Sequence, residues 1–118
     1  MSVFYELRDL SNIPLLNGVT MKAVYGDKSS VAFVDLPAFS RIPLHHHSSE
    51  QIGIVLDGEI EYTVEGETKV CGKGSMFIVP PNANHSLVVV SSKTAKLVDI
   101  FTPKRELTKA LTYVEPAK

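Results

Sequence analysis

Apolar and polar residues alternate over short stretches of this chain, and turn residues separate one stretch from the next. The clearest stretch is 59–65, where Ile60, Tyr62 and Val64 alternate with polar side chains, as in a strand with one buried face. The same reasoning predicts further strands at 21–25, 31–36, 52–56, 68–71, 76–79, 85–90 and 96–101. Asp57-Gly58 is a strong hairpin signal between two of them. Short, regularly spaced strands of this kind predict an all-β antiparallel sandwich or barrel.

The two ends of the chain differ from this central pattern. Residues 1–18 end in the turn signal Asn17-Gly18 and are expected to form an edge strand or an irregular arm. The barrel is expected over about 20–102. Thr102 as N-cap and Pro103 at the first helical position predict a short helix or tail over 103–118.

Length and composition restrict the function classes. A chain of 118 residues forms one domain. Its net charge of -1, without blocks of like charge, argues against nucleic acid as a partner. The single Cys71 excludes an internal disulfide. Glu6, Arg8 and Asp9 interrupt any secretory signal and no apolar run reaches membrane-spanning length, so we expect a cytoplasmic protein without a membrane partner.

All 4 histidines lie in two places, the run 45–47 and the isolated His85. In an extended chain the odd-numbered His45, His47 and Gln51 point to one side, whereas His46 points to the other. Imidazoles and an amide oxygen on one face, met by His85 from a distant strand, predict a site for a divalent metal. The alternative is a surface histidine run that binds nothing.

Two motifs around these histidines resemble those of the cupin family. The first is His45-x-His47, Gln51 and Gly58, with Gln51 where the family usually has Glu; the second is Gly74, Pro80 and His85. The resemblance implies the cupin double-stranded β-helix, a small jelly-roll barrel, with His45, His47, Gln51 and His85 as metal ligands.

Two departures from the cupin motifs concern turns. Phe39 stands where the first motif often has Gly, and Asn82 replaces a Gly of the second. Because Asn tolerates a left-handed backbone, Asn82 is expected to keep its turn.

A narrower likeness is to the pectin-degradation cupins called KdgF. It rests on His-x-His with Gln as the third ligand, on Pro81-Asn82-x-x-His85, and on the segment from Asp99 to Glu106. It implies ring opening of 4,5-unsaturated uronates to linear keto-uronates. It also implies that side chains at the spacing of Asp99, Phe101 and Arg105 line the pocket.

The ligand set itself bears on the chemistry. Imidazoles and a carboxamide are uncharged, so a bound cation would keep its double positive charge, which favours an anionic substrate and strengthens its Lewis acidity. The carboxylate of the facial triad typical of iron oxygenases is missing. The metal can be Ni, Zn, Fe, Mn or Cu, because all of these accept imidazole.

Three further residues have competing interpretations, and a fourth has an expected place. If Asp99 shares an interior face with Leu97 and Phe101, it is a buried carboxylate suited to proton transfer; otherwise it is a polar residue on the outer face. Arg105 either pairs with a substrate carboxylate or is a solvated charge on a terminal helix. Phe101 is either part of the hydrophobic core or a surface on which the substrate rests. Tyr62 is expected at the mouth of the pocket.

Three functions therefore stay open. The first is a metal-dependent isomerase acting on a small carboxylate sugar, with Asp99 and Arg105 as catalytic residues and Phe101, Arg105 and Tyr62 binding substrate. The second is a cupin dioxygenase or oxalate-type enzyme, and the third a non-enzymatic ligand-binding cupin. Sheet edges and the apolar N-terminal arm predict a homodimer, with strand exchange between arms as one route.

Overall fold

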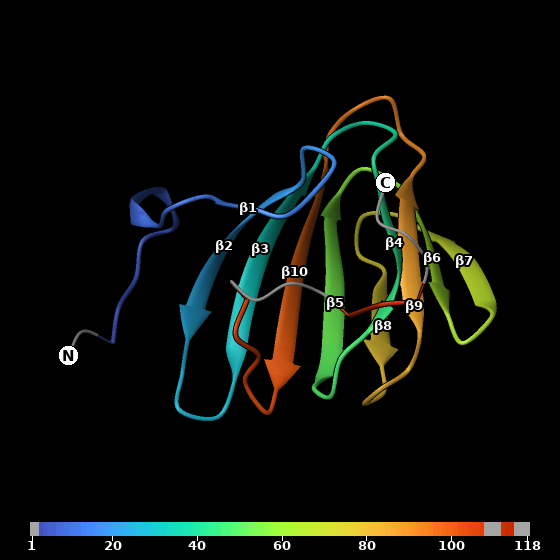
Figure 1. The fold of residues 1–118 in the computed structure, drawn as a ribbon. Helices are drawn as coiled ribbons and strands as arrows, with labels where there is room; N and C mark the ends of the chain where they lie inside the picture. Colours follow the sequence, from blue (N-terminus) through green and yellow to red (C-terminus); the bar gives the residue numbers. More distant parts are fainter. Residues whose placement is uncertain (1–2, 108–111, 115–118) are drawn as a thin grey trace.

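The chain folds into two antiparallel β-sheets that face each other (Figure 1). The computed structural model describes residues 3–107 and 112–114. One sheet has the order β1 (Ile13–Pro14), β2 (Thr20–Tyr25), β3 (Ser30–Leu36), β10 (Ala95–Thr102), β5 (Glu50–Asp57), β8 (Met76–Val79). The other has the order β11 (Thr112–Tyr113), β4 (Arg41–His46), β9 (His85–Val89), β6 (Ile60–Val64), β7 (Glu67–Cys71). The predicted all-β architecture is confirmed.

The predicted hairpin at Asp57-Gly58 is wrong. β5 and β6 belong to different sheets, and β6 pairs with β7 and β9 instead. Gly58 has φ +79°, and a Cβ there would lie 2.7 Å from the Cα of Ala95, so this turn packs against the start of β10 while the chain crosses between sheets. The hairpin in this region joins β6 to β7, with Glu65 and Gly66 both at positive φ.

The helix predicted from Pro103 does not form among the described residues. Pro103–Leu107 is a loop, because tertiary contacts take its backbone groups: the Arg105 N–H donates to Ser30 Oγ (2.9 Å) and the Leu107 N–H to the Tyr25 hydroxyl (3.1 Å). The rest of the predicted helix lies partly outside the described residues. Within the described ranges, helical structure is the single 3-10 turn η1 (Leu7–Asp9), and no helix has the length and hydropathy needed to cross a membrane.

The space between the sheets is apolar at one end and polar at the other. On the inner face of β10, Leu97 lies between Val34 and Val55, whereas the next inward residue, Asp99, lies between Ala32 and Gly53. The apolar core thus ends at Leu97, and the polar region begins at Asp99, the next inward-pointing residue of β10. The sequence alternation of Leu97, Asp99 and Phe101 therefore places Asp99 inside the barrel, and the outer-face alternative is excluded.

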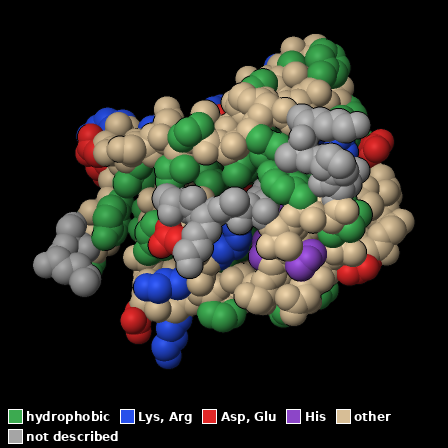
Figure 2. Space-filling view, viewed as in Figure 1, with side chains coloured by type: hydrophobic (Ala, Val, Ile, Leu, Met, Phe, Trp, Pro, Cys, Tyr) green, Lys and Arg blue, Asp and Glu red, His purple; other side chains and the backbone are tan. Residues whose placement is uncertain are grey.

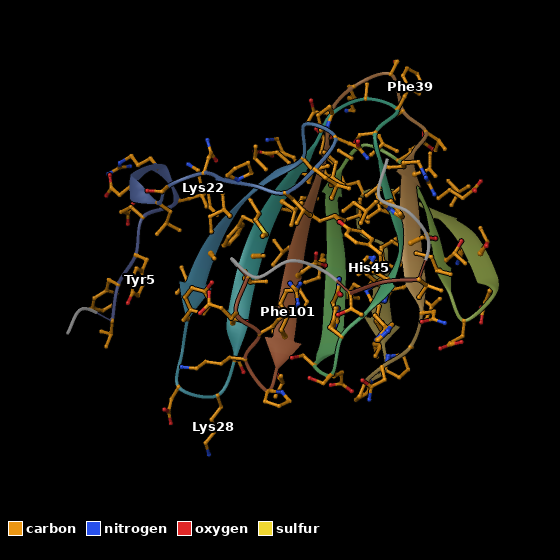
Figure 3. All side chains as sticks on the ribbon, in the orientation of Figure 1. Tyr5, Lys22, Lys28, Phe39, His45 and Phe101 are labelled. Carbon is orange, nitrogen blue, oxygen red and sulfur yellow. The ribbon has the colours of Figure 1, made fainter. Side chains whose placement is uncertain are left out.

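Two turns carry non-glycine residues in the left-handed region. Asn82 has φ 64°, as its place in the second motif led us to expect. Phe39 has φ 60° at an exposed loop at the end of the barrel (Figure 3), where its bulky side chain makes this conformation unfavourable. Both positions use the geometry that glycine adopts without steric cost.

Candidate metal centre

Two of the histidines face each other across neighbouring strands. His45 on β4 is the register partner of His85 on β9, with ring centroids 4.1 Å apart. The pairing of β4 and β9 shifts between Ile42 and His45. Pro43 lies in this irregular stretch and has no N–H to donate to the ladder, which suits it to a bulge. The local distortion lets both imidazoles point into the barrel.

The other two predicted ligands are His47, in the connection between β4 and β5, and Gln51, near the start of β5. His47 follows the end of β4, and its ring lies 4.8 Å from that of His85. Gln51 is 4% exposed on β5, in the opposite sheet. The candidate ligand atoms of the three histidines all lie within 4.8 Å of one another. The structure thus brings together the four residues that sequence spacing selected.

Each imidazole is held in one tautomer by a backbone carbonyl two residues away. A carbonyl can only accept, so in every case Nδ1–H donates and Nε2 keeps a free lone pair. The pairs are His45 with Pro43 (2.7 Å), His47 with Ser49 (3.0 Å) and His85 with Ala83 (2.9 Å). Three lone pairs therefore converge on the space between the sheets.

Two observations show that a divalent cation fits this donor set. The buried Nε2 of His85 has no hydrogen-bond partner. The Nε2 of His47 lies 3.0 Å from Oε1 of Gln51, although both atoms are acceptors once His47 Nδ1 carries the proton. A cation bound between these atoms would give each of their lone pairs a partner. Without a cation, the lone pairs of His47 Nε2 and Gln51 Oε1 face each other and neither atom has a donor among the described residues.

Burial keeps these rings neutral. It lowers the pKa of His45 to about 4 and that of His85 to about 3, and it also lowers the pKa of His47. The neighbouring histidines and the Arg105 guanidinium depress these pKa values further. At neutral pH the site is therefore ready to bind a cation without first losing protons.

Asp99 is the carboxylate next to this donor set. It is 7% exposed, its Oδ1 has no hydrogen-bond partner, and its side chain hydrogen-bonds with Gln51. Burial raises the pKa of Asp99 to about 7, against the opposing effects of the Gln51 hydrogen bond and the positive charge of Arg105. Near neutral pH this carboxyl group can therefore both give and take a proton.

Arg105 and Phe101 lie together at one side of the site. The Phe101 ring is 4% exposed and meets His47 edge-on at 5.4 Å, and the Arg105 Cζ lies 5.4 Å from the centre of the Phe101 ring. Arg105 is half-buried and, with His47, lines a pocket of about 390 Å³. Histidine side chains are visible next to basic ones on this face (Figure 2), and Figure 3 shows His45 and Phe101 in the same region.

Tyr62 lies deeper than we expected. It is 5% exposed, stacks on Phe77 at 3.9 Å, and its hydroxyl lies 3.4 Å from the Gln51 Nε2. It lines a second cavity of about 460 Å³, away from Arg105. Tyr62 therefore contacts the amide of Gln51, and it is not among the residues that line the pocket of Arg105.

Sequence reasoning missed Phe77 and Tyr113. Phe77 lies over Gly53, where a Cβ would come 2.0 Å from its ring, and a glycine inside an apolar strand was the available signal for this close approach. Tyr113 on β11 approaches His45 at 6.2 Å. No sequence signal marked Tyr113, because a strand of 2 residues has no periodicity to detect.

Comparison with known proteins gives a family match over this region. The profile described as "Cupin domain" (Cupin_2) matches residues 32–101, a segment that contains all three histidines of the cluster together with Gln51 and Asp99.

Individual relatives are more distant. The chain is 28% identical to H2HPP isomerase of Bacillus subtilis over 102 residues, which is 86% of this chain and 43% of that protein. It is 32% identical to the pectin degradation protein KdgF of Dickeya dadantii over 63 residues, 53% of this chain and 56% of that one. The chain thus spans about half the length of the curated relatives it matches. The solved structure of KdgF from Halomonas sp. superposes with a TM-score of 0.83 at 22% identity, covering 92% of this chain and 100% of that one, which shows a shared fold.

Proposed function

This chain belongs to the cupin domain family, and from that premise we propose that it is a metal-dependent enzyme acting on a small anionic sugar. The reaction we propose is ring opening of 4,5-unsaturated uronates. The observation that carries the proposal is an uncharged donor set with one buried carboxyl group, Asp99, beside it and one guanidinium, Arg105, at its pocket.

His45, His47, His85 and Gln51 are the residues that would hold the metal, which we expect to be Ni, Zn, Fe, Mn or Cu. When bound, such a cation supplies Lewis acidity and stabilises negative charge on a substrate oxygen. Because these ligands are uncharged, none of the cation's charge would be cancelled by the ligands themselves.

Arg105 is proposed to bind the uronate carboxylate. Its half-buried guanidinium lines the pocket, and the Phe101 ring beneath it restricts its orientation. A planar guanidinium can donate two parallel hydrogen bonds to a carboxylate, which fixes the sugar as well as attracting it. Phe101 supports substrate binding through Arg105, and the position of Tyr62 supports a role in orienting Gln51.

Asp99 is proposed to carry the proton. Ring opening breaks the bond between the anomeric carbon and the ring oxygen, while the anomeric hydroxyl loses its proton and becomes a carbonyl. The ring oxygen leaves as an enolate, and protonation of the alkene carbon then gives the keto group. One proton is removed and one is delivered, so a single carboxyl group can perform both transfers and no oxidant or reductant is needed.

The relatives favour isomerisation. One is named as an isomerase and another for pectin degradation, and neither name implies a reaction that uses dioxygen. Their names support the proposal for this chain without assigning the substrate to it.

The test is incubation of the metal-loaded chain with unsaturated galacturonate while the ultraviolet absorbance of the conjugated alkene is followed. Absorbance should fall. Asp99→Asn should reduce kcat by at least about 100-fold with unchanged metal content, and Arg105→Met should mainly raise KM. Asp27→Asn, on an exposed turn, is the control for loss of a carboxylate.

Two other results would replace the proposal. Unchanged absorbance accompanied by oxygen consumption with a candidate substrate would indicate the dioxygenase function. Unchanged absorbance without any turnover, but with saturable ligand binding, would indicate a binding protein. Full activity of Asp99→Asn would remove Asp99 from the proton transfer.

A further inference from the structure

The loop that carries Arg105 is held by contacts with segments far away in the sequence. This loop, 103–107, follows β10 and lies beside the turn that joins β2 to β3 (Figure 1). At its start, the Ser49 hydroxyl donates to the Pro103 carbonyl (2.7 Å). At its end, the Leu107 side chain is buried in the hydrophobic core. Both ends of the loop are therefore fixed to the barrel.

The centre of the loop is bound by one buried hydroxyl group. Ser30 Oγ donates to the Arg105 carbonyl (3.0 Å) and accepts from the Arg105 N–H (2.9 Å). A serine hydroxyl offers one donor and also accepts, so this single side chain satisfies both backbone polar groups of Arg105. Because Ser30 is 0% exposed, water does not compete for these two hydrogen bonds.

The polar side chain of Ser30 stands in an apolar row. The inward positions of β3 are Ser30, Ala32, Val34 and Leu36, and all four are buried. A buried hydroxyl costs free energy unless it is hydrogen-bonded, and alanine would fill nearly the same volume without that cost. We therefore attribute the serine at this position to its two hydrogen bonds with Arg105.

The same strand position also lies beside the ring that supports the guanidinium. Ser30 is the register partner of Phe101 on β10 and of Tyr25 on β2. The Phe101 ring centre lies 5.4 Å from Arg105 Cζ, and the Tyr25 hydroxyl accepts from the Leu107 N–H (3.1 Å). Three paired residues on neighbouring strands thus contact the Arg105 backbone, the residue two positions after it and the Arg105 side chain.

The guanidinium itself depends on this support. Within residues 3–107 and 112–114, no oxygen atom accepts a hydrogen bond from the Arg105 side chain, so its backbone and the Phe101 ring determine where it lies. Two parallel hydrogen bonds to a carboxylate form only at one orientation of the guanidinium. The apparent affinity falls in proportion to the fraction of molecules in that orientation. A looser loop should therefore weaken carboxylate binding.

We propose that Ser30, together with Tyr25, positions the Arg105 guanidinium for the carboxylate of the substrate. Ser30 is not among the residues that line the pocket of Arg105, so it acts through the Arg105 backbone and not on the substrate. The inference rests on the proposed function, because it concerns the group proposed to bind the uronate. Since the proton transfer belongs to Asp99, substrate binding and turnover should respond differently to the loss of Ser30.

The first test compares Ser30→Ala with the wild-type chain in steady-state turnover of unsaturated galacturonate. KM should rise about 10-fold, as expected when the loop holds the binding orientation for roughly a tenth of the time. The value of kcat should change by less than about twofold, with unchanged metal content. The matched control is Ser40→Ala, because Ser40 Oγ also donates to a backbone carbonyl, that of Pro37 (2.7 Å), in a different loop. Both variants should lose stability, but only Ser30→Ala should change KM. An unchanged KM for Ser30→Ala, or an equal rise for Ser40→Ala, would overturn the proposal.

The second test needs no turnover and therefore separates this proposal from the proposed function. The Arg105 Nε–H resonance is followed by NMR in the full-length chain with Zn²⁺, which is diamagnetic, and is assigned by its absence in Arg105→Met. The Phe101 ring should shift it away from the resonances of Arg8 and Arg41, and in Ser30→Ala it should move toward them. This result in a chain without turnover would support the positioning role and reject only the enzymatic function. An unmoved resonance would overturn the positioning role, whether or not the chain is active.

Circular dichroism shows whether Ser30→Ala is folded. If it is not, Tyr25→Phe decides, because Tyr25 is 38% exposed and this substitution removes only the hydroxyl that binds the Leu107 N–H. A displaced Arg105 resonance in Tyr25→Phe supports the proposal, and a resonance at its wild-type position refutes it.

Discussion

The substitution Asp99→Asn should make the metal-free protein more stable at alkaline pH while removing its activity. Asn keeps the size of the side chain and can still accept the hydrogen bond from Gln51, so the main change is the loss of a carboxyl group that can ionise in a buried site. A residue that a chain keeps at a cost to its stability is characteristic of a catalytic position.

The magnitude follows from the pKa of Asp99, about 7 in the folded protein against 3.8 as the reference value. Because the folded-state pKa is raised, the native state holds its proton more tightly than the unfolded chain does. This group therefore does not reduce wild-type stability below pH 3.8, whereas between pH 3.8 and about pH 7 the stability falls as the pH rises, and above about pH 7 it stays at the lower value. At 1.36 kcal/mol per unit, the difference reaches about 4 kcal/mol at pH 8.

The assay is urea unfolding of both proteins between pH 4 and pH 9 in the presence of a chelator. His45 and His85, whose pKa values are lowered by burial, destabilise the fold as the pH falls below 6.5. Both proteins carry these histidines, so their contribution cancels in the difference between variant and wild type. Asp27→Asn controls for the loss of an exposed carboxylate and should change stability by less than about 0.5 kcal/mol.

The expected result is a stability difference near zero at pH 4 that grows in favour of Asp99→Asn up to about pH 7 and is then constant. A difference that stays flat over the whole range would refute the reasoning, because it would mean that Asp99 is solvated and ionises as it does in the unfolded chain.

Two further substitutions test the construction of the site. His85→Ala should abolish stoichiometric metal binding, measured by elemental mass spectrometry, whereas His46→Ala should retain the metal; equal retention would place the ligands elsewhere. Gly53→Ala should lower the free energy of unfolding by about 2–3 kcal/mol, because a Cβ 2.0 Å from the Phe77 ring must displace it. Gly72→Ala is the control, because a Cβ at this position meets open space. An equally large decrease in the free energy of unfolding for Gly72→Ala would refute the packing argument.

Much of the fold and of the donor set follows from local periodicity. Alternation along 59–65 and 96–101 identified strands and their inward faces, since successive side chains of a strand point to opposite sides. The same parity placed His45 and His47 on one side and made Gln51 their neighbour. These features depend only on where residues stand within one segment, so the sequence alone determined them.

The tertiary structure decided which strands pair and what lies beside each side chain. A turn such as Asp57-Gly58 has the same local signal whether it closes a hairpin or passes to the opposite sheet, and only its packing on Ala95 distinguishes the two. The loop after Thr102 is likewise fixed by hydrogen bonds to Ser30 and Tyr25, far away in the sequence. The perturbed carboxyl group of Asp99 arises from neighbours on other strands. Such contacts depend on register between distant segments, which local periodicity does not encode.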